Sequence, residues 1–125
     1  MDELKPLRWI ASSKDDLSAM PKQVRGDVGQ ALYVAQRGDK HPDAKPLKGF
    51  GGAGVLEVVA RHESDTYRAV YTVRFSTAVY VLHVFQKKAK RGIATPKKEL
   101  DLIDARLKVA QADYQHRITS TGGRA

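Results

Sequence analysis

The run VYVLHVF at residues 79–85 is strongly apolar, and QKKAKRGIATPKK follows it directly at residues 86–98. The first run is rich in β-branched and aromatic residues, which predicts a core strand. The second run holds six basic residues and no acidic one. A dense positive block attached to a rigid strand favours a negatively charged partner, and RNA is the leading candidate.

The length of 125 residues predicts a single domain with one modest core. The longest apolar runs are far too short to span a bilayer, so no membrane partner is expected. The first 16 residues have mixed charge and no apolar core segment, unlike a secretory signal. We therefore expect the protein to stay in the cytoplasm.

The sequence has no cysteine, which excludes disulfides, thiolate metal sites and cysteine nucleophiles. Four histidines are present, and none of them has the close spacing of a metal-binding motif. We therefore expect neither a metal site nor a cofactor. The four are His41, His62, His83 and His116.

Positive charge is concentrated in the second half of the chain. Residues 61–125 hold thirteen Lys and Arg against six Asp and Glu, whereas residues 1–60 hold nine against eight. Such asymmetry creates a field that attracts phosphate polymers. A solvated surface that keeps a small protein soluble would explain the excess alone equally well. The acid-free block favours nucleic acid.

Local patterns predict a series of short strands and amphipathic helices. Gly26 and Gly29 weaken the longer N-terminal helix, and we interpret them as positions where another element packs closely. The tail from about residue 116 is expected to be frayed. The predicted elements are a strand at 7–11, a short helix beginning at Ser12 or Ser13, a helix at 22–36, a Gly- and Pro-rich loop at 38–54, strands at 55–60, 67–75 and 79–85, and a helix that starts at Thr95 and Pro96.

Two hairpin turns, at residues 62–65 and 76–77, align the last three strands and sort their side chains into two faces. This alignment places Arg68 opposite Val59 and Phe85. One face carries no charge, and we expect the helices to cover it. Its members are Leu56, Val58, Ala60, Tyr67, Ala69, Tyr71, Val73, Phe75, Tyr80, Leu82 and Val84.

The opposite face combines cations with a histidine and an aromatic residue, which favours a binding surface. Solvated Arg and Lys on an exposed sheet face are the alternative explanation. The members are Glu57, Val59, Arg61, Arg68, Val70, Arg74, Val81, His83, Phe85 and Lys87.

Three motifs occur in a familiar order: KPLKGF at 45–50, YRAVY at 67–71 and FQKKAKRGIATP at 85–96. Together they resemble the RelE/HigB superfamily of bacterial toxins, in particular its phage-derived HigB-like branch. The likeness runs from about residue 9 to residue 107.

The resemblance implies a small α+β fold of the RelE type, in one domain over residues 1–125. N-terminal helices would pack on a mostly antiparallel twisted sheet, followed by a C-terminal helix. It also implies an endoribonuclease, or mRNA interferase, that cuts mRNA on the ribosome and inhibits translation. The implied partner is an antitoxin, commonly of the helix-turn-helix type.

Carried over from the family, Arg68 matches the strand arginine that contacts the scissile phosphate. Lys87 and Lys88 match the basic pair that ends the next strand, and Arg61 matches a basic residue closing the preceding one. The sequence departs from RelE at Glu57 and its neighbours, where RelE carries lysines. It also has no tyrosine within residues 89–95, where RelE has a catalytic one.

Metal-free RNA cleavage by the ribose 2′-hydroxyl needs a base, a cation at the phosphate and an acid for the leaving oxygen. Arg68 is the first choice for the phosphate because its planar fork binds two oxygens, with Arg61 or Lys88 assisting. His83, Glu57 or a lysine could transfer the proton, if neighbouring cations lower the pKa of that lysine. Lys87, Lys88 and Arg91 could have this effect on one another. A packed strand residue is the alternative interpretation of His83, and an ion pair with Arg68 that of Glu57.

Further residues are candidates for RNA binding. Phe85 could stack on a base or instead pack against the last helix. Lys97 and Lys98 could contact phosphates or be solvated helix residues. The predicted phosphate contacts are Lys48, Lys90, Arg91, Lys97 and Lys98.

Two other functions are compatible with these patterns. ParE-like toxins share the fold and inhibit DNA gyrase without cleaving RNA. A non-catalytic RNA-binding module would explain the basic block and the missing tyrosine.

Overall fold

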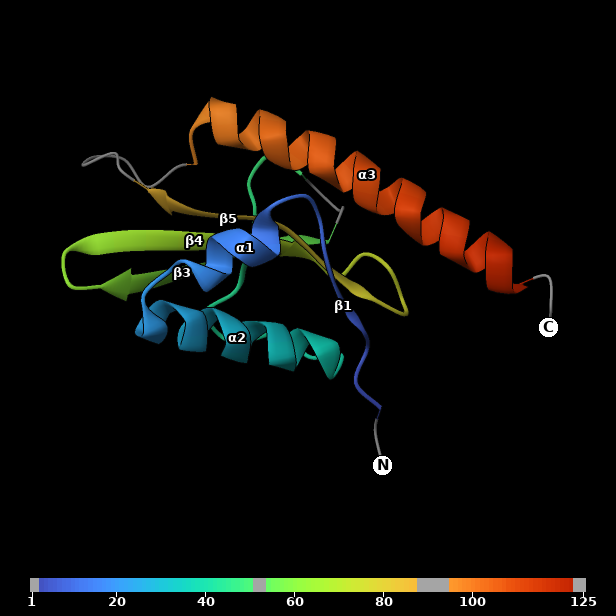
Figure 1. Ribbon diagram of the computed structural model, residues 1–125, viewed down its shortest axis with the longest axis horizontal. Coiled ribbons are helices and arrows are strands. Elements are labelled where there is room, and N and C mark those ends of the chain that lie inside the picture. Colours follow the sequence, from blue (N-terminus) through green and yellow to red (C-terminus); the bar gives the residue numbers. More distant parts are fainter. Residues whose placement is uncertain (1–2, 51–53, 88–94, 123–125) are drawn as a thin grey trace.

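The computed structural model describes residues 3–50, 54–87 and 95–122 (Figure 1). These residues form a five-stranded sheet of order β1-β5-β4-β3-β2 with three helices. Neighbouring strands are antiparallel except for the parallel pair β1–β5. The predicted α+β fold is confirmed. The elements are β1 (Leu7–Trp9), α1 (Ser13–Ser18), α2 (Lys22–Gln36), β2 (Lys45–Pro46), β3 (Val55–His62), β4 (Asp65–Thr72), β5 (Val79–Lys87) and α3 (Lys97–Gly122).

Helices cover both faces of the sheet. Figure 1 shows α2 on one side of the strands and α3 on the other. The α1 and α2 helices pack on β5 and β3, while α3 packs mainly on β5. The sequence had indicated one covered face and one open basic face. That expectation is wrong for the part of the second face that lies beneath α3.

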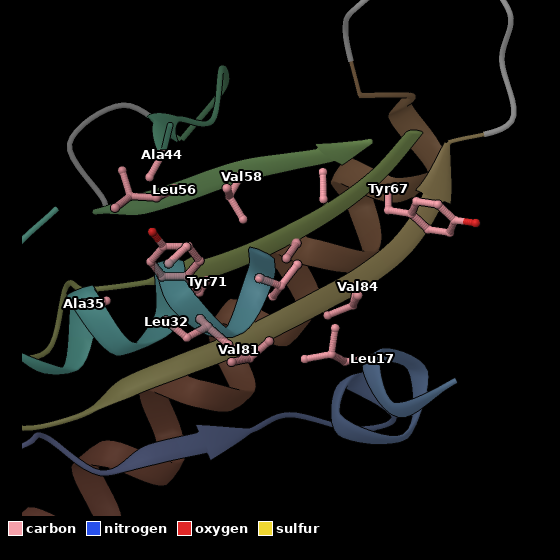
Figure 2. Close-up of a cluster of buried hydrophobic side chains, with 14 of the residues drawn as sticks. Leu17, Leu32, Ala35, Ala44, Leu56, Val58, Tyr67, Tyr71, Val81 and Val84 are labelled. Atoms are coloured by element: carbon pink, nitrogen blue, oxygen red, sulfur yellow. The ribbon is translucent and has the colours of Figure 1, made fainter. Parts of the chain in front are cut away.

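The first face carries the core that α1 and α2 cover (Figure 2). The 3.6-residue spacing in α2 places its apolar side chains on the buried side of the helix. Sheet residues that were predicted for this face meet them there. The cluster includes Leu17, Val24, Val28, Ala31, Leu32 and Ala35 from the helices and Leu56, Val58, Ala60, Tyr67, Ala69, Tyr71 and Val84 from the strands.

A β-bulge in β5 changes which side chains face which way. The predicted pairing of Arg68 with Phe85 is confirmed, but Tyr71 pairs with Val81, so Leu82 is an extra residue. The side chain of Val81 therefore joins the α1–α2 core, whereas Leu82 lies on the α3 face. A two-residue turn at 76–77 was expected, but β4 ends at Thr72 and the connection is longer.

The second face carries the core that α3 covers. Phe75 and Tyr80, which the sequence placed on the other face, belong to this cluster together with Leu82. Arg106 of α3 donates from Nη1 to the Leu82 carbonyl at 3.0 Å, which holds the helix at the bulge. The predicted apolar spacing of the last helix is confirmed, since Ile103, Leu107 and Ala110 are all buried.

Three local expectations differ from the structure. A Cβ at Gly26 or Gly29 would meet nothing within 4 Å, so the close packing expected there is wrong. The two-residue strand β2 lies in the segment expected to be a loop. The α3 helix continues to Gly122, through the tail that was expected to fray from about residue 116. No helix among the described residues is long and apolar enough to cross a membrane.

A half-buried polar contact anchors the second half of α3. The Tyr80 hydroxyl donates to Asp113 Oδ2 at 2.6 Å, and Arg117 Nε donates to the same oxygen at 2.7 Å. The hydrogen bond from Tyr80, followed by that from Arg117, lowers the pKa of Asp113. Burial, followed by the bond to Asp113, raises the pKa of Tyr80 to about 12.

Asp113→Asn should lower stability near neutral pH and weaken its dependence on acid. A carboxylate with a lowered folded pKa contributes stability above its ordinary pKa of 3.8, and this contribution is lost as pH falls through the lowered value. The difference in unfolding free energy between wild type and variant should therefore shrink in acid. Urea unfolding over a pH series measures it. Asp104→Asn, in the exposed pair with Lys108, is the control. Parallel pH curves for wild type and Asp113→Asn would contradict the assignment.

Candidate functional site

A cleft of about 450 Å³ lies over β2, β3 and β4. It occupies the half of the second sheet face that lies away from β5, because α3 packs mainly on β5. Strand alternation puts every second residue of β3 on this face, and the β3–β4 register brings Arg68 beside Val59. The lining residues are Asp43, Lys45, Glu57, Val59, Arg61 and Arg68.

Arg68 lines this cleft as a buried cation, with only 6% of its surface exposed. Its Nη1 donates to Glu57 Oε1 at 2.9 Å and lies 3.5 Å from Thr95 Oγ1. The Thr95 hydroxyl donates to the other carboxylate oxygen of Glu57 at 2.7 Å. Glu57 is thus held by two partners, one from β4 and one from the segment just before α3.

Lys87 lies close enough to Arg68 for their charges to interact. Desolvation and the positive charge of Arg68 lower the pKa of Lys87, and the carboxylate of Glu57 partly opposes this effect. The β4–β5 ladder explains the proximity, because Lys87 pairs with Thr66 and Phe85 pairs with Arg68. The tertiary structure therefore brings Arg61, Arg68 and Lys87 into one neighbourhood, as predicted from the strand alignment.

His83 and Phe85 lie between β5 and α3 rather than in the cleft. His83 is 7% exposed, and its ring stacks on Phe85 with centroids 4.6 Å apart. His83 Nε2 lies 2.8 Å from Glu99 Oε1, and Arg106 Nη1 lies 3.3 Å from Nδ1. The packed-residue interpretation of both side chains is the one that the structure shows, since α3 covers this part of the sheet.

The remaining predicted RNA contacts are dispersed. The side chains of Lys48 and Lys98 are exposed and line no part of the cleft. Lys97 is exposed as well and pairs with Asp101 at 3.0 Å. Lys88, Lys90 and Arg91 lie outside the described residues.

Two cleft residues and one anchor had not been identified from the sequence. Asp43 and Lys45 line the cleft, and Lys45 faces Glu57 in the short β2–β3 ladder. Thr95 had been interpreted only as a helix start, although its place in FQKKAKRGIATP was a signal available in the sequence. Within residues 3–50, 54–87 and 95–122, no three His, Asp or Glu side chains gather as a metal-ligand group.

Solved structures show the class of fold. The described fold is similar to that of a mutant of the E. coli toxin RelE in the free state, with a TM-score of 0.51 and 20% identity over 70% of this chain and 88% of that chain. The RelBE2 toxin–antitoxin complex from Mycobacterium tuberculosis aligns with a TM-score of 0.42 and 22% identity over 71% of this chain and 100% of that chain. The similarity to the E. coli structure shows that the chain has a RelE-type fold.

The family is shown by the sequence. The family described as "Phage derived protein Gp49-like (DUF891)" matches residues 15–108. The chain belongs to this phage-derived Gp49-like family, and its predicted resemblance to the RelE/HigB superfamily is confirmed. No curated protein matches the sequence.

Arg68→Met should destabilise the fold because it leaves the Glu57 carboxylate desolvated without its cation. The side chains of Arg68 and Glu57 are only 7% and 14% exposed, and breaking such a pair costs about 3 kcal/mol. Adding Glu57→Gln to Arg68→Met should recover most of that loss. Urea unfolding of both single variants and the double variant measures the coupling.

Lys97→Met is the matched control, because it breaks an exposed pair with Asp101 on α3. It should change the unfolding free energy by less than about 0.5 kcal/mol. If Arg68→Met costs no more than this control, the buried ion pair is not a stabilising contact.

Proposed function

We propose that this protein is the toxin of a type II toxin–antitoxin system and a ribosome-dependent mRNA endoribonuclease. The carrying observation is that Arg61 and Arg68 from neighbouring strands line one cleft, with Lys87 beside Arg68. Membership of the Gp49-like family and the RelE-type fold support the same function.

In the proposed reaction the ribose 2′-hydroxyl attacks the neighbouring phosphorus, and the bond to the 5′-oxygen breaks. The leaving 5′-oxygen takes a proton from water, and the products are a 2′,3′-cyclic phosphate and a 5′-hydroxyl end. Arg68 stabilises the charge that builds on the phosphate oxygens, because its guanidinium is permanently charged and held in a low-dielectric setting. Arg61, exposed at the same cleft, binds an adjacent backbone phosphate.

Lys87 is our candidate for taking the 2′-hydroxyl proton. A lysine is a base only when neutral, and a lowered pKa increases its neutral fraction. His83 is disfavoured for this role because both ring nitrogens already contact α3. Glu57 is disfavoured because its two oxygens hold Arg68 and Thr95.

The proposed function implies two kinds of partner, which are mRNA on the ribosome and an antitoxin. Ribosome-bound mRNA would contact the cations of the segment 86–98, including Lys88, Lys90 and Arg91, as well as Lys48. Such contacts with phosphates make binding steeply salt-dependent. A cognate antitoxin of the helix-turn-helix type would inhibit the protein by covering the cleft or by keeping it from the ribosome.

Arg68→Lys should reduce mRNA cleavage about 100-fold, because lysine keeps the charge beside Glu57 but loses the planar fork that binds two phosphate oxygens. The measurement is the mapping of transcript ends after induced expression, together with cleavage on purified ribosomes. Arg74→Lys is the control, since Arg74 is exposed and outside the cleft. It should cleave like the wild type.

The other candidate functions give different results in the same experiment. If transcripts stay intact and DNA supercoiling is defective, the protein is a gyrase inhibitor and not a nuclease. If the protein binds RNA tightly and in a salt-sensitive way but produces no new transcript ends, it is a non-catalytic RNA-binding module.

The cleavage rate should rise with pH and level off above the lowered pKa of Lys87, below the ordinary value of 10.5. The reason is that the proposed base acts in its deprotonated form. Lys87→Arg, which stays protonated, should be slower and should lose this dependence. Initial rates over a pH series measure it, with Lys40→Arg, exposed and outside the cleft, as control. An unchanged profile in Lys87→Arg would exclude Lys87 as the base.

A further inference from the structure

Thr95 lies within the basic run of residues 86–98, two positions before α3 begins, and it is 8% exposed. The helix begins at Lys97, two residues later, and its first backbone bond runs from the Leu100 amide to the Pro96 carbonyl at 3.0 Å. The Thr95 hydroxyl has one hydrogen to donate. It donates that hydrogen to Glu57 Oε2 on β3, which is 38 positions away in the sequence.

This hydrogen bond links two parts of the proposed site through one carboxylate. Oε2 of Glu57 accepts from Thr95, and Oε1 accepts from Nη1 of Arg68 at 2.9 Å. A shift of the Glu57 side chain would therefore move both the guanidinium and the start of α3. Arg68 Nη1 also lies 3.5 Å from Thr95 Oγ1, so the guanidinium, the carboxylate and the hydroxyl are all close together.

The first turn of α3 has a second attachment, at Glu99. Glu99 Oε1 lies 2.8 Å from His83 on β5, so the helix start is held on two different strands. Lys87 precedes residues 88–94 and pairs with Thr66 in the β4–β5 ladder. In the sequence, Lys88, Lys90 and Arg91 lie between Lys87 and Thr95. Lys87 is part of the sheet, and Thr95 is hydrogen-bonded to it through Glu57.

We infer that Thr95 is a positioning residue, which acts through Glu57 to orient Arg68 and to fix the start of α3 beside the cleft. This inference rests on the proposed function. Cations held in place before the substrate binds stabilise a transition state better than cations that must first be ordered. The hydroxyl of Thr95 thus matters for turnover, although it need not touch the RNA.

Thr95→Val keeps the shape of the side chain and removes the hydrogen bond. It should lower kcat for mRNA cleavage about tenfold while KM changes less, because Arg68 is misoriented in the transition state but remains available for binding. Thr95→Ser restores a hydroxyl and should return kcat to within about twofold of the wild type.

Thr77→Val is the matched control. It removes a threonine hydroxyl bond of 2.9 Å to Tyr114, which lies outside the cleft. This variant should keep the wild-type kcat. The inference is overturned if Thr95→Val behaves like Thr77→Val, or if Thr95→Ser remains as slow as Thr95→Val.

Amide hydrogen exchange tests the positioning role of Thr95 without a measurement of RNA cleavage. If the wild type cleaves no mRNA, the proposed function fails, and the positioning role is then decided by exchange at the backbone amides of residues 99–103. These amides should exchange faster in Thr95→Val, return to the wild-type rate in Thr95→Ser and stay unchanged in Thr77→Val. Equal exchange in Thr95→Val and the wild type would overturn the inference.

Discussion

The packing of α3 on β5 is the contact on which the rest of this structure depends. Ile103, Leu107 and Ala110 are buried against the second face of the sheet. Burial of apolar surface is the main force that holds such a helix in place. Because the helix covers only the β5 side of this face, it leaves a cleft bounded by strand arginines instead of a broad, open basic surface.

The same packing changes the role of each polar residue beneath it. His83 becomes a structural contact for Glu99 and Arg106, and Phe85 stacks on its ring. Val70 on β4 belongs to the core beneath α3. Arg68, two positions earlier on the same strand, lines the cleft instead. A buried guanidinium requires a partner, and Glu57 supplies it. Glu57 departs from the lysines of RelE, but it compensates a cation that the fold has removed from water.

Much of the fold followed from local patterns. The spacing in α2 and at the start of α3, the β3 and β5 strands and the pairing of Arg68 with Val59 and Phe85 were all predicted correctly. The helix spacings, the strands and the pairing with Val59 depend on side-chain periodicity and the short β3–β4 turn, which neighbouring residues determine. The pairing of Arg68 with Phe85 agrees with the prediction because the extra residue Leu82 compensates for the different connection between β4 and β5. The motifs at 45–50, 67–71 and 85–96 indicated the superfamily because their residues and their order can be read directly from the sequence.

The amino-acid sequence by itself determined the family, the type of every helix and strand except β2, and the strand arginine Arg68 as a candidate for phosphate binding. Only the tertiary structure decided that Leu82 is the extra residue of a bulge, that α3 closes over His83 and that Thr95 meets Glu57. The physical reason is distance along the chain. A bulge and a contact across 38 positions depend on how whole elements pack, and no local period encodes that packing.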